Sequence, residues 1–172
     1  MKLNVTSSSA CKVLVVENNF NELPIIERSI IKDYRKFLWS PFIKGVKDYE
    51  MISAGDKIAV CISGGKDSLL LAKMMQELHK YSSVPFELEF IAMNPGFNDI
   101  NKEILINSCD KLGIPVKIFE TEIFKIVDKI AQDYPCYMCA RMRRGALYGY
   151  AQELGCNKIA LGHHFDDFIE TT

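Results

Sequence analysis

The sequence predicts an α/β fold: a doubly wound, mostly parallel sheet with helices on both faces and a small N-terminal helical cap. Four short apolar segments, rich in β-branched and aromatic residues and typical of buried strands, alternate with segments of helical spacing. Strands that alternate with helices join through right-handed crossovers, so they lie parallel in one sheet. Turns that contain glycine follow three of these segments. We expect strands at residues 57–62, 86–93, 115–119 and 158–161.

The chain divides into three parts. Residues 1–22 form a mostly polar tail to which we assign no role, residues 23–54 the helical cap, and residues 55–172 the main domain. A length of 172 residues suits one domain with an appendage. A helical pattern still runs at Thr172 without a cap, which predicts that the domain is truncated at its C-terminus.

The cap is predicted to contain two helices. Apolar residues at helical spacing begin at Leu23, and Ser40 followed by Pro41 predicts an N-cap and a new helix that ends near Met51. Basic residues outnumber acidic ones here, so the cap presents either an ordinary solvated face or a surface for RNA. The basic residues are Lys32, Arg35, Lys36, Lys44 and Lys47.

The turn Ser63–Ser68 joins the first strand to an amphipathic helix that carries Leu70, Met74 and Leu78 on one face. A glycine-containing turn at a helix start exposes backbone N–H groups and lets a phosphate approach closely. Lys66 adds a positive charge, and Asp67 could hold a divalent cation. The alternative is a capped helix start with a tight turn.

The main domain is expected to contain further helices at residues 100–112, 122–132 and 141–154, the first and last stopped by glycine. In such folds ligands bind outside the carboxyl ends of the strands. The Ser63–Ser68 turn, Met93 with Asn94, and His163–Asp167 all follow strands. The sequence therefore predicts a nucleotide crevice at this edge of the sheet.

Cys136 and Cys139 have a spacing that lets two thiols bind one metal ion or cluster from a tight turn before a helix. Two ligands complete neither a zinc site nor an iron–sulfur site. A redox pair and two small half-buried residues remain as alternatives.

Arg141, Arg143 and Arg144, with Tyr148 one turn further, form a basic helix that suits phosphate backbones and stacked bases. By helical spacing Arg141 and Arg144 share a face and Arg143 points elsewhere. A solvated helix face is the alternative.

The segment after the fourth strand combines imidazoles and carboxylates. His163, His164, Asp166 and Asp167 could bind Mg²⁺, orient ATP or transfer a proton. Alternatively, the two aspartates cap a helix and complement its dipole.

The composition and net charge of the chain limit the classes of partner that it is expected to bind. The net charge of −1 makes no global case for nucleic acid, so an RNA site must be a local patch. No apolar run reaches the roughly 18–20 residues of a membrane helix, and residues 1–10 lack a signal-peptide core. We therefore expect a cytoplasmic protein with no membrane partner, whose six cysteines are thiols, metal ligands or catalytic groups.

Three motifs together resemble the tRNA 2-thiocytidine synthetases, which are ATP-dependent tRNA-cytidine 2-sulfurtransferases of the PP-loop, or N-type ATP pyrophosphatase, superfamily. They are Ser-Gly-Gly-Lys-Asp-Ser at 63–68, Pro-Cys-x-x-Cys-Ala-Arg-x-Arg-Arg-Gly-x-Leu-Tyr at 135–148, and Gly-His-His-x-Asp-Asp-x-x-Glu-Thr at 162–171. The motifs occur in the family's order, and the resemblance extends from about Trp39 to the chain's last residue. Lysidine synthetases share the first motif but lack the cysteine pair.

The resemblance implies a two-stage reaction. The O2 carbonyl of an anticodon-loop cytidine attacks ATP and releases pyrophosphate, and a sulfur then displaces AMP to give 2-thiocytidine. It implies ATP, Mg²⁺ and a [4Fe–4S] cluster as cofactors, and tRNA and a sulfur donor charged by a cysteine desulfurase as partners; a homodimer stays open. Two cluster cysteines match Cys136 and Cys139; the third normally lies downstream, and neither Cys61 nor Cys156 fits the pattern.

The resemblance also assigns site residues. Asp67, Asp166, Asp167 and His163 are the expected catalytic residues. The expected RNA contacts are Arg141, Arg143 and Arg144. The expected ATP contacts are Ser63, Gly64, Gly65, Lys66, Asp67, Ser68, Met93, Gly162 and His164. Another tRNA-modifying ligase of the superfamily and a non-catalytic ATP- or zinc-binding module are the alternative functions.

Overall fold

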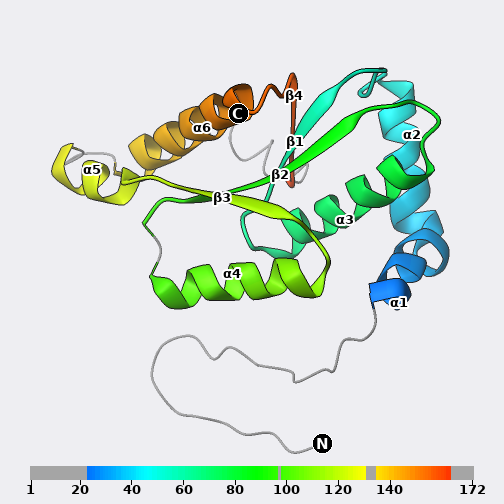
Figure 1. Ribbon diagram of the computed structural model, residues 1–172, viewed down its shortest axis with the longest axis horizontal. Coiled ribbons are helices and arrows are strands. Elements are labelled where there is room, and N and C mark those ends of the chain that lie inside the picture. Colours follow the sequence, from blue (N-terminus) through cyan, green and yellow to red (C-terminus); the bar gives the residue numbers. More distant parts are fainter. Residues whose placement is uncertain (1–22, 97, 131–134, 164–172) are drawn as a thin grey trace, which may run out of the picture.

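The computed structural model describes residues 23–96, 98–130 and 135–163 (Figure 1). Within these residues four strands form one sheet in the order β3-β2-β1-β4, and every neighbouring pair is parallel. In this register Val60 lies opposite Phe90 on one side and Ala160 on the other. The parallel sheet predicted from the sequence is confirmed. The strands are β1 (Lys57–Cys61), β2 (Glu87–Asn94), β3 (Val116–Glu120) and β4 (Lys158–Leu161).

Helices cover both faces of the sheet, as Figure 1 shows, so the fold is doubly wound. On one face Ile58 and Val60 of β1 pack against α3 and α4, and on the other Ala59 and Cys61 pack against α6. Because β1 is buried on both faces, its sequence is a continuous apolar run without alternation. The helices are α3 (Lys66–Tyr81), α4 (Asp99–Lys111), α5 (Ile123–Ile130) and α6 (Pro135–Glu153).

The cap packs on α3, the helix that follows the predicted phosphate loop. Ile30 and Trp39 of the cap form a buried cluster with Met74 of α3. The cap therefore braces the helix whose start carries the candidate site. Its elements are α1 (Leu23–Arg28), the π-helical segments η1 (Ser29–Asp33) and η2 (Arg35–Trp39), and α2 (Ser40–Asp48).

The predicted helix start at Ser40 is wrong in detail. Ser40 itself is helical, with φ −66° and ψ −44°, and α2 has no side-chain cap. Pro41 stands in the first turn of α2, the part of a helix where a missing N–H is best tolerated. The irregular point is Tyr34, where φ is −98° and ψ is 17°.

Other element boundaries differ by a few residues, with one consequence for function. The helix predicted from residue 141 begins at Pro135, so the cysteine pair lies inside α6 and not in a turn before it. Proline is favoured at the first position of a helix because its missing N–H would have had no partner there. In the described part of the chain, no helix is long and apolar enough to span a membrane.

Candidate functional site

The loop between β1 and α3 contains one glycine that the backbone requires. Gly64 has φ +84°, a conformation that L side chains rarely adopt, and a Cβ there would lie 3.3 Å from Leu105 Cδ1. Gly65 has φ −78° and ψ 158°, which other residues also adopt. The first glycine of the motif is therefore fixed by local geometry, and the second is free to serve a ligand's approach.

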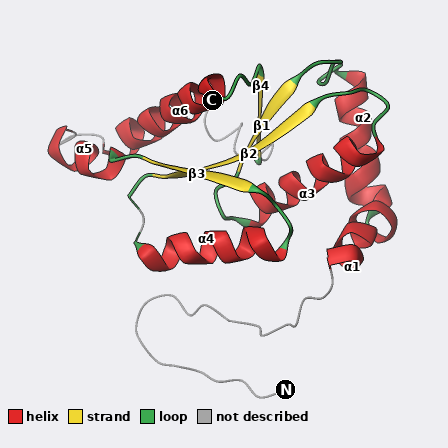
Figure 2. Ribbon diagram, viewed as in Figure 1, coloured by secondary structure: helices red, strands yellow, loops and turns green. Residues whose placement is uncertain are grey.

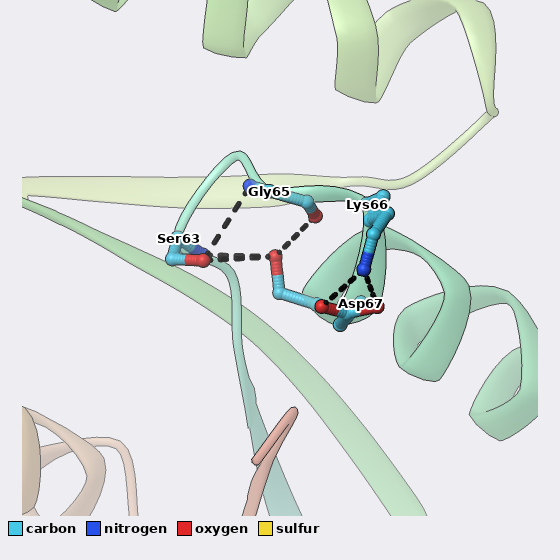
Figure 3. Close-up of polar contacts among 5 residues, drawn as sticks. Ser63, Gly65, Lys66 and Asp67 are labelled. Carbon is cyan, nitrogen blue, oxygen red and sulfur yellow. Dashed lines mark hydrogen bonds and ion pairs between the residues drawn. The ribbon is translucent and has the colours of Figure 1, made fainter. Parts of the chain in front are cut away.

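Two hydroxyls hold this loop in shape (Figure 3). Ser68 Oγ donates to the Gly65 carbonyl oxygen at 2.9 Å and accepts from the Ser63 backbone N–H at 3.1 Å and the Ser63 hydroxyl at 3.2 Å. Ser68 is buried, whereas Ser63 is exposed. The Ser68 hydroxyl thus organises the loop, and the exposed Ser63 hydroxyl is the one placed to meet a ligand.

Lys66 and Asp67 form an ion pair at the first turn of α3. The Lys66 ammonium lies 2.7 and 2.9 Å from the two Asp67 carboxylate oxygens, and the lysine side chain is 85% exposed. An exposed pair of this kind is worth only about 0–1 kcal/mol, so a phosphate or a metal ion could separate it at small cost.

A cavity of about 310 Å³ opens where β1 and β4 end. The strand order reverses at this point, because β2 and β3 lie on one side of β1 and β4 on the other. Such a switch point is where open α/β sheets bind ligands. Figure 2 shows the loops that leave the strands at this edge. The lining residues come from β1 and its loop (Cys61, Ile62, Ser63), α3 (Ser68), β2 (Met93), β4 and the segment after it (Leu161, Gly162, His163) and α6 (Ala140, Arg143, Arg144, Leu147, Tyr148).

The cavity brings two predicted sites together. Ser63 and Ser68 of the phosphate loop line it with Arg143 and Arg144, which the sequence assigned to RNA. Arg141 is exposed and is not among the lining residues. The expectation that Arg143 points away from Arg144 is wrong, because α6 turns its 140, 143, 144, 147 and 148 positions, one strip of helical spacing, toward the cavity.

Gly162 has a packing role that sequence reasoning missed. A Cβ at this position would lie 3.0 Å from Ser68 Cα and backbone N, and 3.1 Å from the carbonyl carbon of Asp67. The segment after β4 therefore meets the start of α3 backbone to backbone. A glycine directly after a strand was the only sequence signal for this contact.

His163, the only described member of its predicted cluster, is exposed and lines the cavity. His164, Asp166 and Asp167 lie outside the described residues. Of the predicted catalytic carboxylates, the structure therefore places Asp67 alone among the described residues.

Cys136 and Cys139 occupy the first turns of α6. Cys136 is exposed, and Cys139 is half-buried against a cluster formed by Met93, Ile123 and Val127. No group of three or more histidine, cysteine or acidic residues within metal-binding reach occurs among the described residues. The pair thus fits as part of a ligand set that needs further donors.

Cys61, which also lines the cavity, was not predicted as a site residue. Burial raises the pKa of its thiol to about 11, with a smaller effect from Cys156. The thiol is therefore protonated at neutral pH, and a metal ligand would have to be a thiolate. Cys61 therefore contributes a small, uncharged side chain to the lining of the cavity.

Comparison with known proteins gives the family. Residues 38–172 match the PP-loop domain. The chain belongs to the PP-loop family. The similarity of the first motif to a PP-loop, stated from its residues, is confirmed. The PP-loop of this chain is the Ser63–Ser68 turn, and the crevice beside it is the candidate nucleotide site.

Several curated relatives of this PP-loop protein are tRNA-cytidine(32) 2-sulfurtransferases. The one from Pelobacter propionicus is 37% identical over 172 residues, covering 98% of this chain and 60% of the relative. The one from Alcanivorax borkumensis is 43% identical over 133 residues, covering 74% of this chain and 46% of the relative. The chain thus spans 60% or less of the length of these relatives.

A solved structure supports the fold. The U34-tRNA thiolase NcsA from Methanococcus maripaludis, determined with its [4Fe-4S] cluster, has a TM-score of 0.59 and 26% identity to this PP-loop protein. The match covers 79% of this chain and 53% of the thiolase.

Proposed function

We propose that this chain carries the nucleotide-binding part of an ATP-dependent tRNA thiolase that converts an anticodon-loop cytidine to 2-thiocytidine. One observation carries the proposal: the PP-loop, the end of β4 and the arginine strip of α6 line one crevice at the switch point of the sheet. Curated relatives 37–43% identical to the chain are tRNA-cytidine(32) 2-sulfurtransferases, which supports tRNA as the substrate class.

The loop residues suit the phosphates of ATP. The backbone N–H groups of Gly64 and Gly65 and the Ser63 hydroxyl lie at the start of α3, where the helix dipole favours an anion. Asp67 is the proposed ligand of Mg²⁺, joined by Asp166 or Asp167 from outside the described residues. When bound, Mg²⁺ would offset phosphate charge.

The proposed reaction is the two-stage one that the resemblance implies, and this placement is compatible with it. The cytidine O2 attacks the α-phosphorus, the bond to the β-phosphate oxygen breaks, and pyrophosphate leaves. A sulfur nucleophile, derived from a cysteine desulfurase, then adds at C2 and AMP departs with the original oxygen. His163, exposed at the crevice, is the proposed proton carrier, and Met93 and His164 are proposed to contact the nucleotide.

Cys136 and Cys139 are the proposed ligands of a [4Fe–4S] cluster, which would supply the site where the sulfur is held. Their donors suit iron–sulfur chemistry, and they precede Arg143 by four and seven residues on the same helix. At 1.5 Å per residue, this places them about 6 and 11 Å from Arg143 along the α6 axis.

Arg141 is the proposed RNA contact of α6, since it is exposed and outside the cavity lining. The cap adds exposed cations at Lys32, Arg35 and Lys36, beside the exposed ring of Phe37. Such a mixture of cations and aromatic rings suits a single-stranded RNA loop.

Mass spectrometry of tRNA nucleosides tests the proposal. In a host that makes 2-thiocytidine, deleting the gene should remove this nucleoside, and the intact gene should restore it. An unchanged 2-thiocytidine level in the deletion strain would exclude this substrate and favour another base or a small amide.

Metal analysis separates the thiolase from a zinc-binding module. After anaerobic purification the thiolase should be brown and contain iron and acid-labile sulfide. A Cys136→Ser, Cys139→Ser variant should lose both, and a Cys156→Ser variant should keep them. Colourless protein with zinc bound to the same pair would support the module.

A further inference from the structure

We propose that Arg143 and Arg144 bind the polyphosphate of the nucleotide in the crevice and do not bind the RNA backbone. The inference rests on the proposed ATP site and assigns its cations. Its first support is placement: both side chains line the same cavity of about 310 Å³ as Ser63 and Ser68 of the PP-loop.

The charge of the cavity is the second support. Among its described lining residues no carboxylate occurs, while two guanidiniums do. Within the described part of the chain, neither Arg143 nor Arg144 forms a salt bridge, although Lys57, Lys73, Lys102 and Lys158 all do. Cations that face a cavity without a counter-charge favour an anionic ligand.

The lysine of the PP-loop is not among the described residues that line this cavity. Lys66 is paired with Asp67 and lines a different hollow, an apolar one between the cap and α3 that also includes Tyr34 and Leu69. The motif suggests Lys66 as the phosphate cation, but the crevice receives its positive charge from α6.

The size and shape of the cavity favour a small molecule over RNA. A volume of about 310 Å³ is near the lower end of small-molecule sites, roughly 300–1,000 Å³. Guanidiniums bind phosphate oxygens in a bidentate manner, and two in succession can contact adjacent phosphates. When pyrophosphate leaves, these groups would also stabilise its developing charge.

The test compares arginines of one helix. Arg143→Ala with Arg144→Ala removes both crevice cations, and Arg141→Ala is the control, because it removes an exposed arginine of α6 outside the cavity. Calorimetry with ATP and with inorganic pyrophosphate measures the anion site. Filter binding of tRNA over a salt series measures RNA contacts separately.

We expect the double variant to bind ATP and pyrophosphate about tenfold to a hundredfold more weakly, since each lost bond involves charged groups. Its tRNA salt slope should not change. Arg141→Ala should keep both anion affinities and flatten the tRNA salt slope by about one unit. If the alanine double variant does not fold, Arg143→Gln with Arg144→Gln removes the charge with less change in shape and carries the same expectations.

The outcomes separate this inference from the proposed function. A double variant that binds ATP and pyrophosphate as tightly as the unsubstituted chain, and that loses tRNA, overturns the inference and leaves the ATP site intact. An unsubstituted chain that binds neither ATP nor pyrophosphate overturns both. If pyrophosphate binding depends on Arg143 and Arg144 but deletion of the gene leaves the 2-thiocytidine level unchanged, the inference stands and the proposed tRNA reaction is excluded.

Discussion

Among the described residues, the two ends of the sheet differ in whether their charged side chains have partners of opposite charge. At the amino ends of β1 and β4, the Asp56 carboxylate, only 6% exposed, accepts the Ser53 N–H at 2.6 Å, the Asn157 amide at 2.7 Å and the Lys158 ammonium at 2.7 Å. At the carboxyl ends, among the described residues, the crevice presents two arginines without a carboxylate partner.

This difference separates structure from binding. A buried carboxylate with three hydrogen-bond donors holds β1, β4 and the segment before β1 together, and its burial keeps it away from a ligand. Cations without partners add little to the fold but keep their capacity to bind an anion. Substitutions at the amino end should therefore cost stability, and those at the carboxyl end should cost binding and chemistry.

The largest effect is expected at Asp67. Asp67→Ala should lower pyrophosphate release by about a hundredfold or more, because an electrostatic contact at the reacting phosphates is lost. The free energy of unfolding should change by about 1 kcal/mol or less, since the side chain is half-exposed in the first turn of α3 and lies outside the hydrophobic core. A pyrophosphate-release assay and thermal unfolding measure the two quantities.

Asp99→Ala is the matched control, because Asp99 is also an aspartate in the first turn of a helix, α4, but lies outside the PP-loop. It should retain full pyrophosphate release. Retained ATP cleavage in Asp67→Ala would remove Asp67 from the site.

The second-largest effect is expected from Gly162→Ala, which should weaken ATP binding at the carboxyl end of the sheet. The added Cβ would press on the backbone of Ser68 at 3.0 Å and displace the start of α3 from the end of β4. Because small displacements at a binding site are costly, ATP affinity should fall by about tenfold to a hundredfold. Calorimetry with ATP checks this, and an unchanged affinity would mean that the contact relaxes without moving the PP-loop.

At the amino end, Asp56→Ala should lower Tm by several degrees and leave ATP affinity unchanged. It removes a buried carboxylate, leaves the Asn157 amide and the Ser53 N–H without this acceptor, and leaves Lys158 with the Met51 carbonyl but without its counter-charge. Asp48→Ala is the control: it removes an exposed ion pair with Lys44, worth about 0.5 kcal/mol or less. Equal Tm changes in the two variants would contradict the structural role.

The Asp56 carboxylate makes the stability of the fold depend on pH. The hydrogen bond from Lys158, then those from Ser53 and Asn157, lower the pKa of Asp56 to about 2, against about 3.9 in an unfolded chain. Its stabilising contribution is therefore complete above pH of about 4 and is lost as the pH falls toward 2. Thermal unfolding from pH 6 to pH 2 should show this loss, and Asp56→Ala should show a shallower decline.

The smallest expected effect is a gain in stability from a substitution at Gly149. Gly149 lies inside α6 with no atom within 4 Å of an added Cβ, and it is not among the residues that line the crevice. Gly149→Ala should therefore stabilise the chain by about 0.5–1 kcal/mol, which raises Tm by about 2–4 °C at most. Its ATP affinity should stay the same, in contrast to Gly162→Ala. A Tm that falls would show that α6 needs this glycine.

The sequence by itself determined the architecture and the position of the PP-loop. The continuous apolar run of β1 and the alternation of strands with helical spacing are local patterns, and a doubly wound parallel sheet follows from chain connectivity. The two glycines of the turn were visible as a signal for a tight turn or a phosphate's approach, but only the structure shows that Gly64 is the one with φ +84°. Helix limits were less certain, because Pro135 and Pro41 each suit a helix start but do not fix which residue begins it.

Only the tertiary structure decided which side of α6 faces the crevice and what Gly162 touches. Helical spacing allows Arg144 to share a face with Arg141 at one side or to join Arg143 at the other, and it does not state which face meets the sheet, so the grouping of Arg144 with Arg141 was wrong. The contact of Gly162 with Ser68 joins segments 94 residues apart by number, which no local pattern reports. Likewise, only the structure shows that Arg143 and Arg144 of α6, and not Lys66 of the PP-loop, are the cations among the described residues that line the crevice.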